Sequence, residues 1–210
     1  MVMRLYNYIS RKTEGFRPLR GKTVGLYTCG PTVYDTAHIG NLRTYVFEDV
    51  LRRTLEMAGF RVKHVMNITD VDDKTIARAK ERGITQGELT RGYEKAFFAD
   101  LEKLNIKPAW KYPRATEHVR EMIAQIKALM KKGLAYEADG SVYFDISKFK
   151  NYGRLSRIEK RQLKAGASAS ARRDGRVDVD DYAKDAAEDF ALWKAKKGGE
   201  PSWPSPWGEG

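Results

Sequence analysis

The sequence predicts an α/β fold in which helices pack on a parallel sheet, and the chain's first half provides the observations. In residues 22–29, KTVGLYTC, alternate positions place Val24, Leu26 and Thr28 on one face, and the segment ends before Gly30. This pattern indicates a buried strand that runs into a loop. Residues 60–68, FRVKHVMNI, indicate a second strand, and a helical pattern follows each strand. Two successive strand–helix units favour parallel pairing of the strands.

The two helices of these units have clear end signals. The first is predicted to begin at Ile39 and to end at Gly59. The second, within residues 69–83, is predicted to be capped at Thr69 or Asp70 and to end at Gly83. The buried stripe expected on the first helix comprises Leu42, Val46, Val50 and Leu55.

Two more helices and a hairpin are expected further along the chain. Thr85 and Glu88 form a capping box for a third helix, and a fourth helix is expected to stop at Gly133. Residues 134–147 predict a hairpin that turns at Asp139-Gly140, with its second strand at 142–146. The stripe of the third helix comprises Tyr93, Phe97, Leu101 and Leu104, and that of the fourth comprises Val119, Met122, Ile123, Ile126 and Met130.

The last third of the chain has a different composition. Residues 160–188 are poor in large apolar side chains and rich in Ala, Gly and charge, which predicts a mobile or extended connection. Residues 189–194, DFALWK, are briefly apolar again. An irregular segment with three prolines and two tryptophans is expected over residues 199–210.

Composition limits the class of protein. The chain has 210 residues with 39 Lys and Arg against 28 Asp and Glu, a formal charge of +11, which fits either a polyanionic partner or a solvated basic surface. A single Cys excludes an internal disulfide and suits a reducing compartment. Without a signal-peptide core or an apolar run near the ~20 residues that span a bilayer, we expect a cytoplasmic protein with no membrane partner.

The junction of the first strand and first helix is a candidate phosphate site. A loop that leads onto a helix N-terminus offers free N–H groups and the positive end of the helix dipole. His38 there could stabilise charge on a phosphorus under attack, and Asn41 would add an amide donor. Alternatively, His38 only caps the helix and Gly40 only permits close packing.

The order of motifs resembles one family. Residues 29–41 (CGPTVYDTAHIGN), 43–53 (RTYVFEDVLRR) and 67–74 (NITDVDDK) are similar to the start of cysteinyl-tRNA synthetases, which are class I enzymes with a HIGH-type motif. The resemblance continues through PRAT, YGRLSR, DFALWK and EPSWPSPWG, so it covers nearly the whole chain. It implies the first half of a Rossmann-like catalytic domain (1–114), an inserted α+β connective domain (115–187) and a return segment (188–210).

The resemblance also implies a set of site residues. Cys29 would be a ligand of a zinc ion that binds the thiolate of substrate cysteine in its open position, since soft thiolate ligation separates cysteine from serine. Its partner ligands, a Cys, a His and a Glu, and a KMSKS loop are expected beyond Gly210. Thr69 would lie beside the substrate, and His38 and Asn41, which replaces the last His of HIGH, would be catalytic. The ATP site would comprise Gly30, Pro31, Thr32, His38, Gly40 and Asn41.

The activity implied is that of a cysteine–tRNA ligase. L-cysteine would react with ATP, accompanied by Mg²⁺, and the cysteinyl group would pass to tRNA(Cys), with Arg154, Arg157 and residues 160–176 as candidate tRNA contacts. Two alternatives are a cysteine ligase that acylates a sugar amine, as in mycothiol synthesis, and a non-catalytic protein that binds RNA or nucleotide.

Structural roles are preferred for the remaining polar and aromatic candidates. Acids at 70, 72 and 73 could suggest a metal site, but acids in a first helical turn favourably meet the helix dipole. His64, within a strand, and His118, within a helix, are expected to be structural. Trp203 and Trp207 are expected to fasten the final segment, although stacking on a base is the alternative for them and for Trp193.

Overall fold

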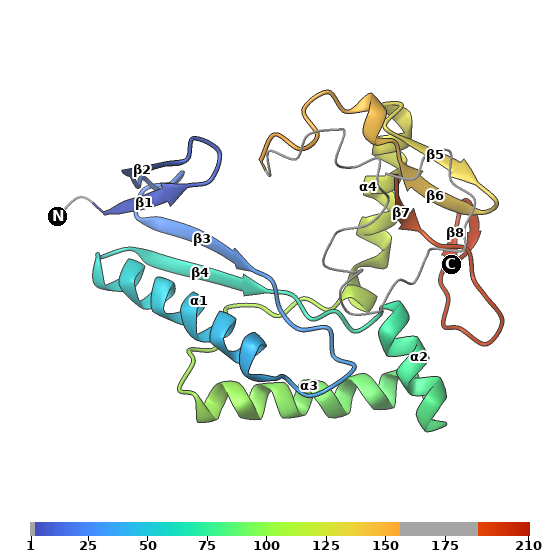
Figure 1. The fold of residues 1–210 in the computed structure, drawn as a ribbon, viewed down its shortest axis with the longest axis horizontal. Coiled ribbons are helices and arrows are strands. Elements are labelled where there is room, and N and C mark those ends of the chain that lie inside the picture. Colours follow the sequence, from blue (N-terminus) through green and yellow to red (C-terminus); the bar gives the residue numbers. More distant parts are fainter. Residues whose placement is uncertain (1–2, 156–188) are drawn as a thin grey trace. The chain divides into compact units, whose positions relative to one another are not determined.

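The computed structural model describes residues 3–155 and 189–210, shown in colour in Figure 1. They form two compact units, one of residues 3–7 and 12–119 and the other of residues 8–11, 120–155 and 189–210. Arg157 and the connection predicted over residues 160–188 lie outside the described residues. The division into domains at 114 and 187 stays a prediction.

The first unit contains the predicted parallel pair. Strands β3 (Thr23–Thr28) and β4 (Arg61–Met66) pair in parallel along their whole length. Residues 111–114 run parallel to β4 and the residues after it, because isolated parallel bridges join Val65 to Lys111 and Ile68 to Arg114. The predicted α/β class and parallel pairing are therefore confirmed.

Helix α1 (Ile39–Met57) follows β3 and begins at the predicted residue. Its C-cap is Ala58, and Gly59 follows in a left-handed conformation with φ +85°. The predicted stripe is wrong in part, because Val46 and Val50 are 40% and 54% exposed. The buried residues of this helix are Tyr45, Glu48, Asp49 and Leu55.

Long-range partners explain why an acid replaces an apolar residue on the buried side of α1. The Asp49 carboxylate accepts a hydrogen bond from the backbone N–H of Lys107 at 3.0 Å and pairs with Arg53 at 2.5 Å. A buried carboxylate is tolerated when it is paired and hydrogen-bonded. Lys107 is 58 residues away in the chain, so local periodicity could not indicate this arrangement.

Helix α2 (Asp73–Arg82) begins later than predicted. The N-cap is Asp72 and not the predicted Thr69 or Asp70. The Asp72 side chain accepts a hydrogen bond from the N–H of Lys74. Thr69 still belongs to the extended chain, where it forms a parallel bridge with Thr32. The predicted end is confirmed, since Gly83 is the left-handed C-cap.

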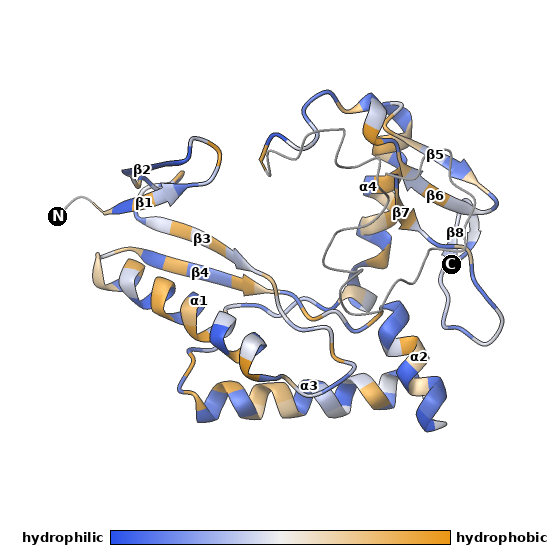
Figure 2. Ribbon diagram, in the orientation of Figure 1, coloured by the Kyte–Doolittle hydropathy of each residue, from blue (hydrophilic) through white to orange (hydrophobic). Residues whose placement is uncertain are grey.

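Helix α3 (Gln86–Lys103) has the predicted capping box, with Thr85 and Glu88 bonded reciprocally. Leu104 of the predicted stripe is instead the C-cap and is 42% exposed. Figure 2 shows apolar and polar segments alternating along α1 and α3, as expected for helices that bury one side. The core that these helices share with the sheet comprises Val33, Tyr45, Met66, Ile68, Phe97, Leu101 and Ile106.

The second unit is built on the predicted hairpin. Strands β5 (Ala135–Ala138) and β6 (Ser141–Phe144) are joined by Asp139 and Gly140, which both have positive φ, as a type I′ turn requires. The second strand ends at Phe144 and not at 146, because Asp145 caps the short turn Ile146–Lys148. Strand β7 (Phe190–Trp193) joins β6 antiparallel, so this part of the return segment extends the hairpin's sheet.

The fourth helix, α4 (Val119–Lys131), follows a single turn at Ala115–His118, and Gly133 follows it with φ +68°. His118 therefore lies in that short turn, where it is exposed. The final segment contains a small antiparallel pair, β8 (Pro204–Ser205) and β9 (Gly208–Glu209).

The ring of Trp207 lies 6.1 Å from that of Trp193, in line with the fastening role expected for it.

Strands β1 (Arg4–Asn7) and β2 (Lys12–Gly15) form an antiparallel pair that the sequence reasoning did not predict. None of the helices in the described ranges is long and apolar enough to cross a membrane.

Candidate functional site

Asn67 organises the loop that follows β3. The backbone N–H of Gly30 donates to Asn67 Oδ1 at 3.1 Å, and the Tyr27 hydroxyl donates to the same atom at 2.9 Å. The Asn67 amide in turn donates to Thr69 Oγ1 at 3.0 Å. Sequence reasoning missed Asn67, although a polar residue directly after a buried strand is the signal that could have found it.

Backbone bonds bring Thr69 against the same loop. Its N–H donates to the Pro31 carbonyl at 2.9 Å, and its own carbonyl accepts from the N–H of Val33 at 3.2 Å. Together with the parallel bridge between Thr32 and Thr69, these bonds join the residues that follow β3 and β4. Four of the predicted site residues, Gly30, Pro31, Thr32 and Thr69, are thus brought together where α/β sheets bind ligands.

His38, Gly40 and Asn41 form a second group at the start of α1. The N–H of Gly40 donates to His38 Nδ1 at 3.0 Å, and the N–H of His38 donates to Asn41 Oδ1 at 3.2 Å. Because Nδ1 accepts this bond, the neutral imidazole carries its proton on Nε2, which makes Nε2 a donor. Both interpretations of His38 can therefore hold, since one ring nitrogen caps the helix and the other remains available.

The start of α1 is electrostatically suited to an anion. The helix is 19 residues long and its first turn holds no acidic residue, so nothing there neutralises the positive end of its dipole. His38, Gly40 and Asn41 are all exposed. Gly40 also has a steric role, because a Cβ at this position would lie 2.8 Å from Cε1 of the His38 ring.

The segment between the two groups is held to the core and to α2. Val33 is 1% exposed in the core, which fixes the start of the segment. Asp35 pairs with Arg78 of α2 at 3.0 Å, and the Lys74 ammonium lies 5.5 Å from the ring centroid of Tyr34. The loop is therefore anchored to α2 and to the core before it reaches His38.

Cys29 is exposed and is the only cysteine of the chain. Its thiol makes a long contact of 3.7 Å to the carbonyl of Gly30. Within residues 3–155 and 189–210, no group of three or more His, Cys, Asp or Glu side chains could hold a metal ion. Cys29 alone does not fit the four-ligand requirement of zinc, so these residues do not by themselves form a zinc site.

Buried titratable groups surround Thr28, the residue before Cys29. Burial raises the pKa of Glu48, and a hydrogen bond from Thr28 partly offsets this effect. Burial, followed by the charge of Arg52, lowers the pKa of His64. The pKa of Tyr45 is raised to about 12 by burial and by the charges of Glu48 and Cys29, so its hydroxyl keeps its proton.

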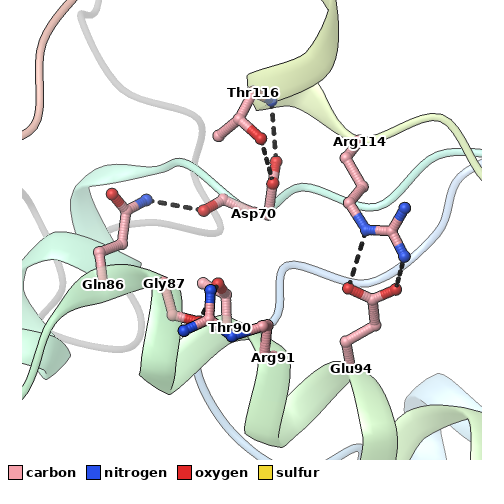
Figure 3. Close-up of a pocket in the computed structure, with 8 residues that line it drawn as sticks. All are labelled: Asp70, Gln86, Gly87, Thr90, Arg91, Glu94, Arg114 and Thr116. Carbon is pink, nitrogen blue, oxygen red and sulfur yellow. Dashed lines mark hydrogen bonds and ion pairs between the residues drawn. The ribbon is translucent and has the colours of Figure 1, made fainter.

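A pocket of about 360 Å³ lies between α3 and residues 114–116 (Figure 3). The Asp70 carboxylate there accepts from the N–H and hydroxyl of Thr116 at 3.0 and 2.5 Å, and the Arg114 guanidinium pairs with Glu94. Asp70 thus has a structural role, but as the partner of Thr116 and not in the first turn of α2 as predicted. The pocket residues are Asp70, Gln86, Gly87, Thr90, Arg91, Glu94, Arg114 and Thr116, and none of them belongs to the predicted site.

The family model for the catalytic domain of class I (C) tRNA synthetases matches residues 15–210. The chain belongs to this tRNA synthetase family. The resemblance based on residues 29–41 and 67–74 is therefore confirmed, and with it the class I fold. Arg154, a predicted tRNA contact, is exposed in the second unit, and its contact with tRNA stays a prediction.

Two curated relatives of this tRNA synthetase chain are cysteine–tRNA ligases. The cysteine–tRNA ligase of Brachyspira hyodysenteriae is 51% identical over 98% of the chain, and that of Pyrococcus abyssi is 49% identical over 100%. The chain spans 42% of the length of each of these relatives.

Among solved structures, the methionyl-tRNA synthetase of Mycobacterium tuberculosis in complex with methionyl-adenylate matches with a TM-score of 0.53. It is 19% identical, and the match covers 60% of this chain and 25% of that one. At this level of identity the similarity supports the fold alone.

Proposed function

We propose that this chain provides part of the catalytic site of a cysteine–tRNA ligase, which activates L-cysteine with ATP and transfers it to tRNA(Cys). The observation that carries the proposal is the start of α1, where His38 Nδ1 accepts the N–H of Gly40 and leaves Nε2 as a donor at an uncompensated helix N-terminus. The cysteine–tRNA ligases at 49–51% identity support the choice of amino acid.

In the activation step, a carboxylate oxygen of cysteine attacks the α-phosphorus of ATP. A new phosphorus–oxygen bond forms, the bond to the β-phosphate breaks, and pyrophosphate leaves. His38 Nε2–H would donate to the phosphate oxygens as negative charge develops, an effect worth ~2.7–4 kcal/mol for comparable donors. Asn41 Oδ1 already accepts from the N–H of His38, so the Asn41 NH₂ group is the part that would donate to the phosphate oxygens. This amide has no titrating proton.

In the transfer step, a hydroxyl at the 3′ end of tRNA attacks the carbonyl carbon of cysteinyl-AMP, and AMP leaves. The formal charge of +11 suits a polyanionic partner of this kind. Arg154 is the described residue proposed to contact the tRNA.

Cys29 and Thr69 are proposed to contact the substrate cysteine. Thr69, which follows β4, is held by Asn67 and by the Pro31 carbonyl, and Cys29 lies exposed directly after β3. Cys29 is also proposed as one ligand of a zinc ion, which would bind the substrate thiolate in preference to the serine hydroxyl. Cys29 is the one cysteine that the described residues could supply to such a site, and they contain no group of three or more metal-binding side chains.

The test is amino-acid-dependent exchange of pyrophosphate into ATP by the protein expressed from its complete reading frame. We expect exchange with cysteine and little with serine, followed by charging of tRNA(Cys). Pyrophosphate exchange whose rate does not depend on cysteine would overturn the proposal. Transfer of cysteine to a sugar amine in place of tRNA would support the mycothiol-type alternative instead.

A further inference from the structure

A buried polar chain joins the last residue of β3 to α1 and β4. Thr28, Glu48 and His64 are 8%, 9% and 3% exposed, and each comes from a different element. His64 lies opposite Leu26 in the parallel register, two residues from the partner of Thr28, so both side chains share one face of the sheet.

One buried hydrogen bond and one electrostatic contact link the three residues. The Thr28 hydroxyl oxygen lies 2.8 Å from His64 Nε2, within hydrogen-bond distance. The Thr28 hydroxyl also lowers the pKa of the Glu48 carboxyl, against the larger opposite effect of burial. Among the described residues, His64 Nδ1 and one Glu48 oxygen have no hydrogen-bond partner.

Such an arrangement is a poor way to stabilise a core. Replacing both members of a buried polar pair by apolar groups of similar shape is often neutral or stabilising, whereas an unsatisfied buried group costs free energy. Here the polar chain converges on the residue directly before Cys29, at the strand end where the proposed substrate contacts gather. Its placement therefore favours a role in holding that strand end.

We propose that Glu48, Thr28 and His64 act as positioning residues that fix the end of β3 and thereby Cys29 for the cysteine substrate. The inference rests on the proposed function, since it concerns the amino-acid side of the same site. Bonds to a second layer of residues commonly fix the orientation of groups that contact ligand. The Thr28 hydroxyl is bonded to His64 of β4, and Glu48 of α1 is the buried carboxyl whose pKa it lowers.

The central variant is Thr28→Val, which keeps the shape of the side chain and removes the hydroxyl. Thr28→Ser is the conservative rescue, and Thr54→Val is the matched control, because the exposed Thr54 hydroxyl only donates to Val50 within α1. His64→Phe tests the other end of the chain with a residue of similar volume. Urea unfolding measures the stability of every variant.

The first readout needs no activity. The protein from its complete reading frame is treated with an aromatic disulfide reagent, and mass spectrometry of the peptide that contains Cys29, the one cysteine of residues 1–210, gives the reaction rate of that residue alone. We expect Thr28→Val and His64→Phe to change this rate by about tenfold, while Thr28→Ser and Thr54→Val leave it unchanged.

The second readout is pyrophosphate exchange by the protein from its complete reading frame. We expect the KM for cysteine to rise about tenfold in Thr28→Val while the KM for ATP stays constant. Variants that lose stability but keep both the thiol rate and the cysteine KM would show a merely structural role and overturn the proposal. If the parent protein shows no exchange, the proposed function fails, and the thiol rates alone decide the positioning role.

Discussion

The carbonyl oxygen of Asn67 lies 1.7 Å from the position that a Cβ on Gly30 would occupy. No side-chain rotation relieves this overlap, because the obstructing atom belongs to the backbone of the neighbouring chain segment. Gly30 is therefore required by the close approach of the loop to Asn67, whose side chain also accepts the Gly30 N–H.

Gly30→Ala is expected to displace the loop from Asn67 and to cost about 1–3 kcal/mol in the free energy of unfolding. The matched control is Gly25→Ala in β3, where a Cβ meets nothing within 4 Å. Urea unfolding of both variants measures the difference. Equal stabilities would contradict the tight approach of Gly30 to Asn67.

The two roles of His38 can be separated by substitution. His38→Ala removes the helix cap and is expected to destabilise the chain by about 1 kcal/mol, whereas Asn at this position can still accept the N–H of Gly40. We therefore expect thermal unfolding of His38→Asn to stay close to the parent. A parent-like stability of His38→Ala would argue against the capping geometry.

Asp72, and not Asp70, is expected to support the start of α2. Asp72→Ala removes the acceptor for the Lys74 N–H and should cost about 1 kcal/mol, while Asp72→Asn should restore most of it. Far-UV circular dichroism during urea unfolding is the measurement. No loss of stability in Asp72→Ala would mean that another residue caps the helix.

His64 predicts a pH dependence of stability. Burial, followed by the charge of Arg52, lowers its pKa, while Asp49 opposes the shift. Below about pH 6.5 the unfolded chain therefore binds a proton that the folded chain does not, and stability falls as the pH drops, with a slope of at most about 1.4 kcal/mol per pH unit.

His64→Phe should remove this component of the slope between about pH 7.5 and about pH 5.5. The raised pKa of Glu48 acts in the opposite direction, because the folded chain then holds its proton more tightly as the pH falls. The comparison is the urea-unfolding free energy of parent and variant across that range. Parallel pH curves would contradict a lowered pKa for His64.

The elements that local sequence decides were predicted well. The alternation in residues 22–29 and the left-handed Gly83 depend on neighbouring residues, and so does the box of Thr85 and Glu88, so the strand, the helix end and the cap follow from them. The parallel pairing follows because two strand–helix units leave few other topologies.

The errors arise where a distant partner decides the outcome. Asp70 could not cap α2, because its carboxylate binds Thr116, 46 residues away. The buried side of α1 includes Glu48 and Asp49, whose partners are on β3 and at Lys107. A prediction based on apolar residues alone therefore assigned the wrong side of this helix to the core. Asn67 was missed for the same reason, since its bonds to Gly30 and Tyr27 cross between strands.

The proposed role of His38 is to stabilise charge during activation of cysteine by ATP. The most direct test compares cysteine-dependent pyrophosphate exchange by the parent protein, His38→Asn and the control His118→Gln, each from the complete reading frame. His38→Asn keeps the cap but loses the imidazole donor, so its kcat should fall about 10²–10³-fold at nearly unchanged stability, while His118→Gln matches the parent. Parent-like exchange by His38→Asn would contradict the claim.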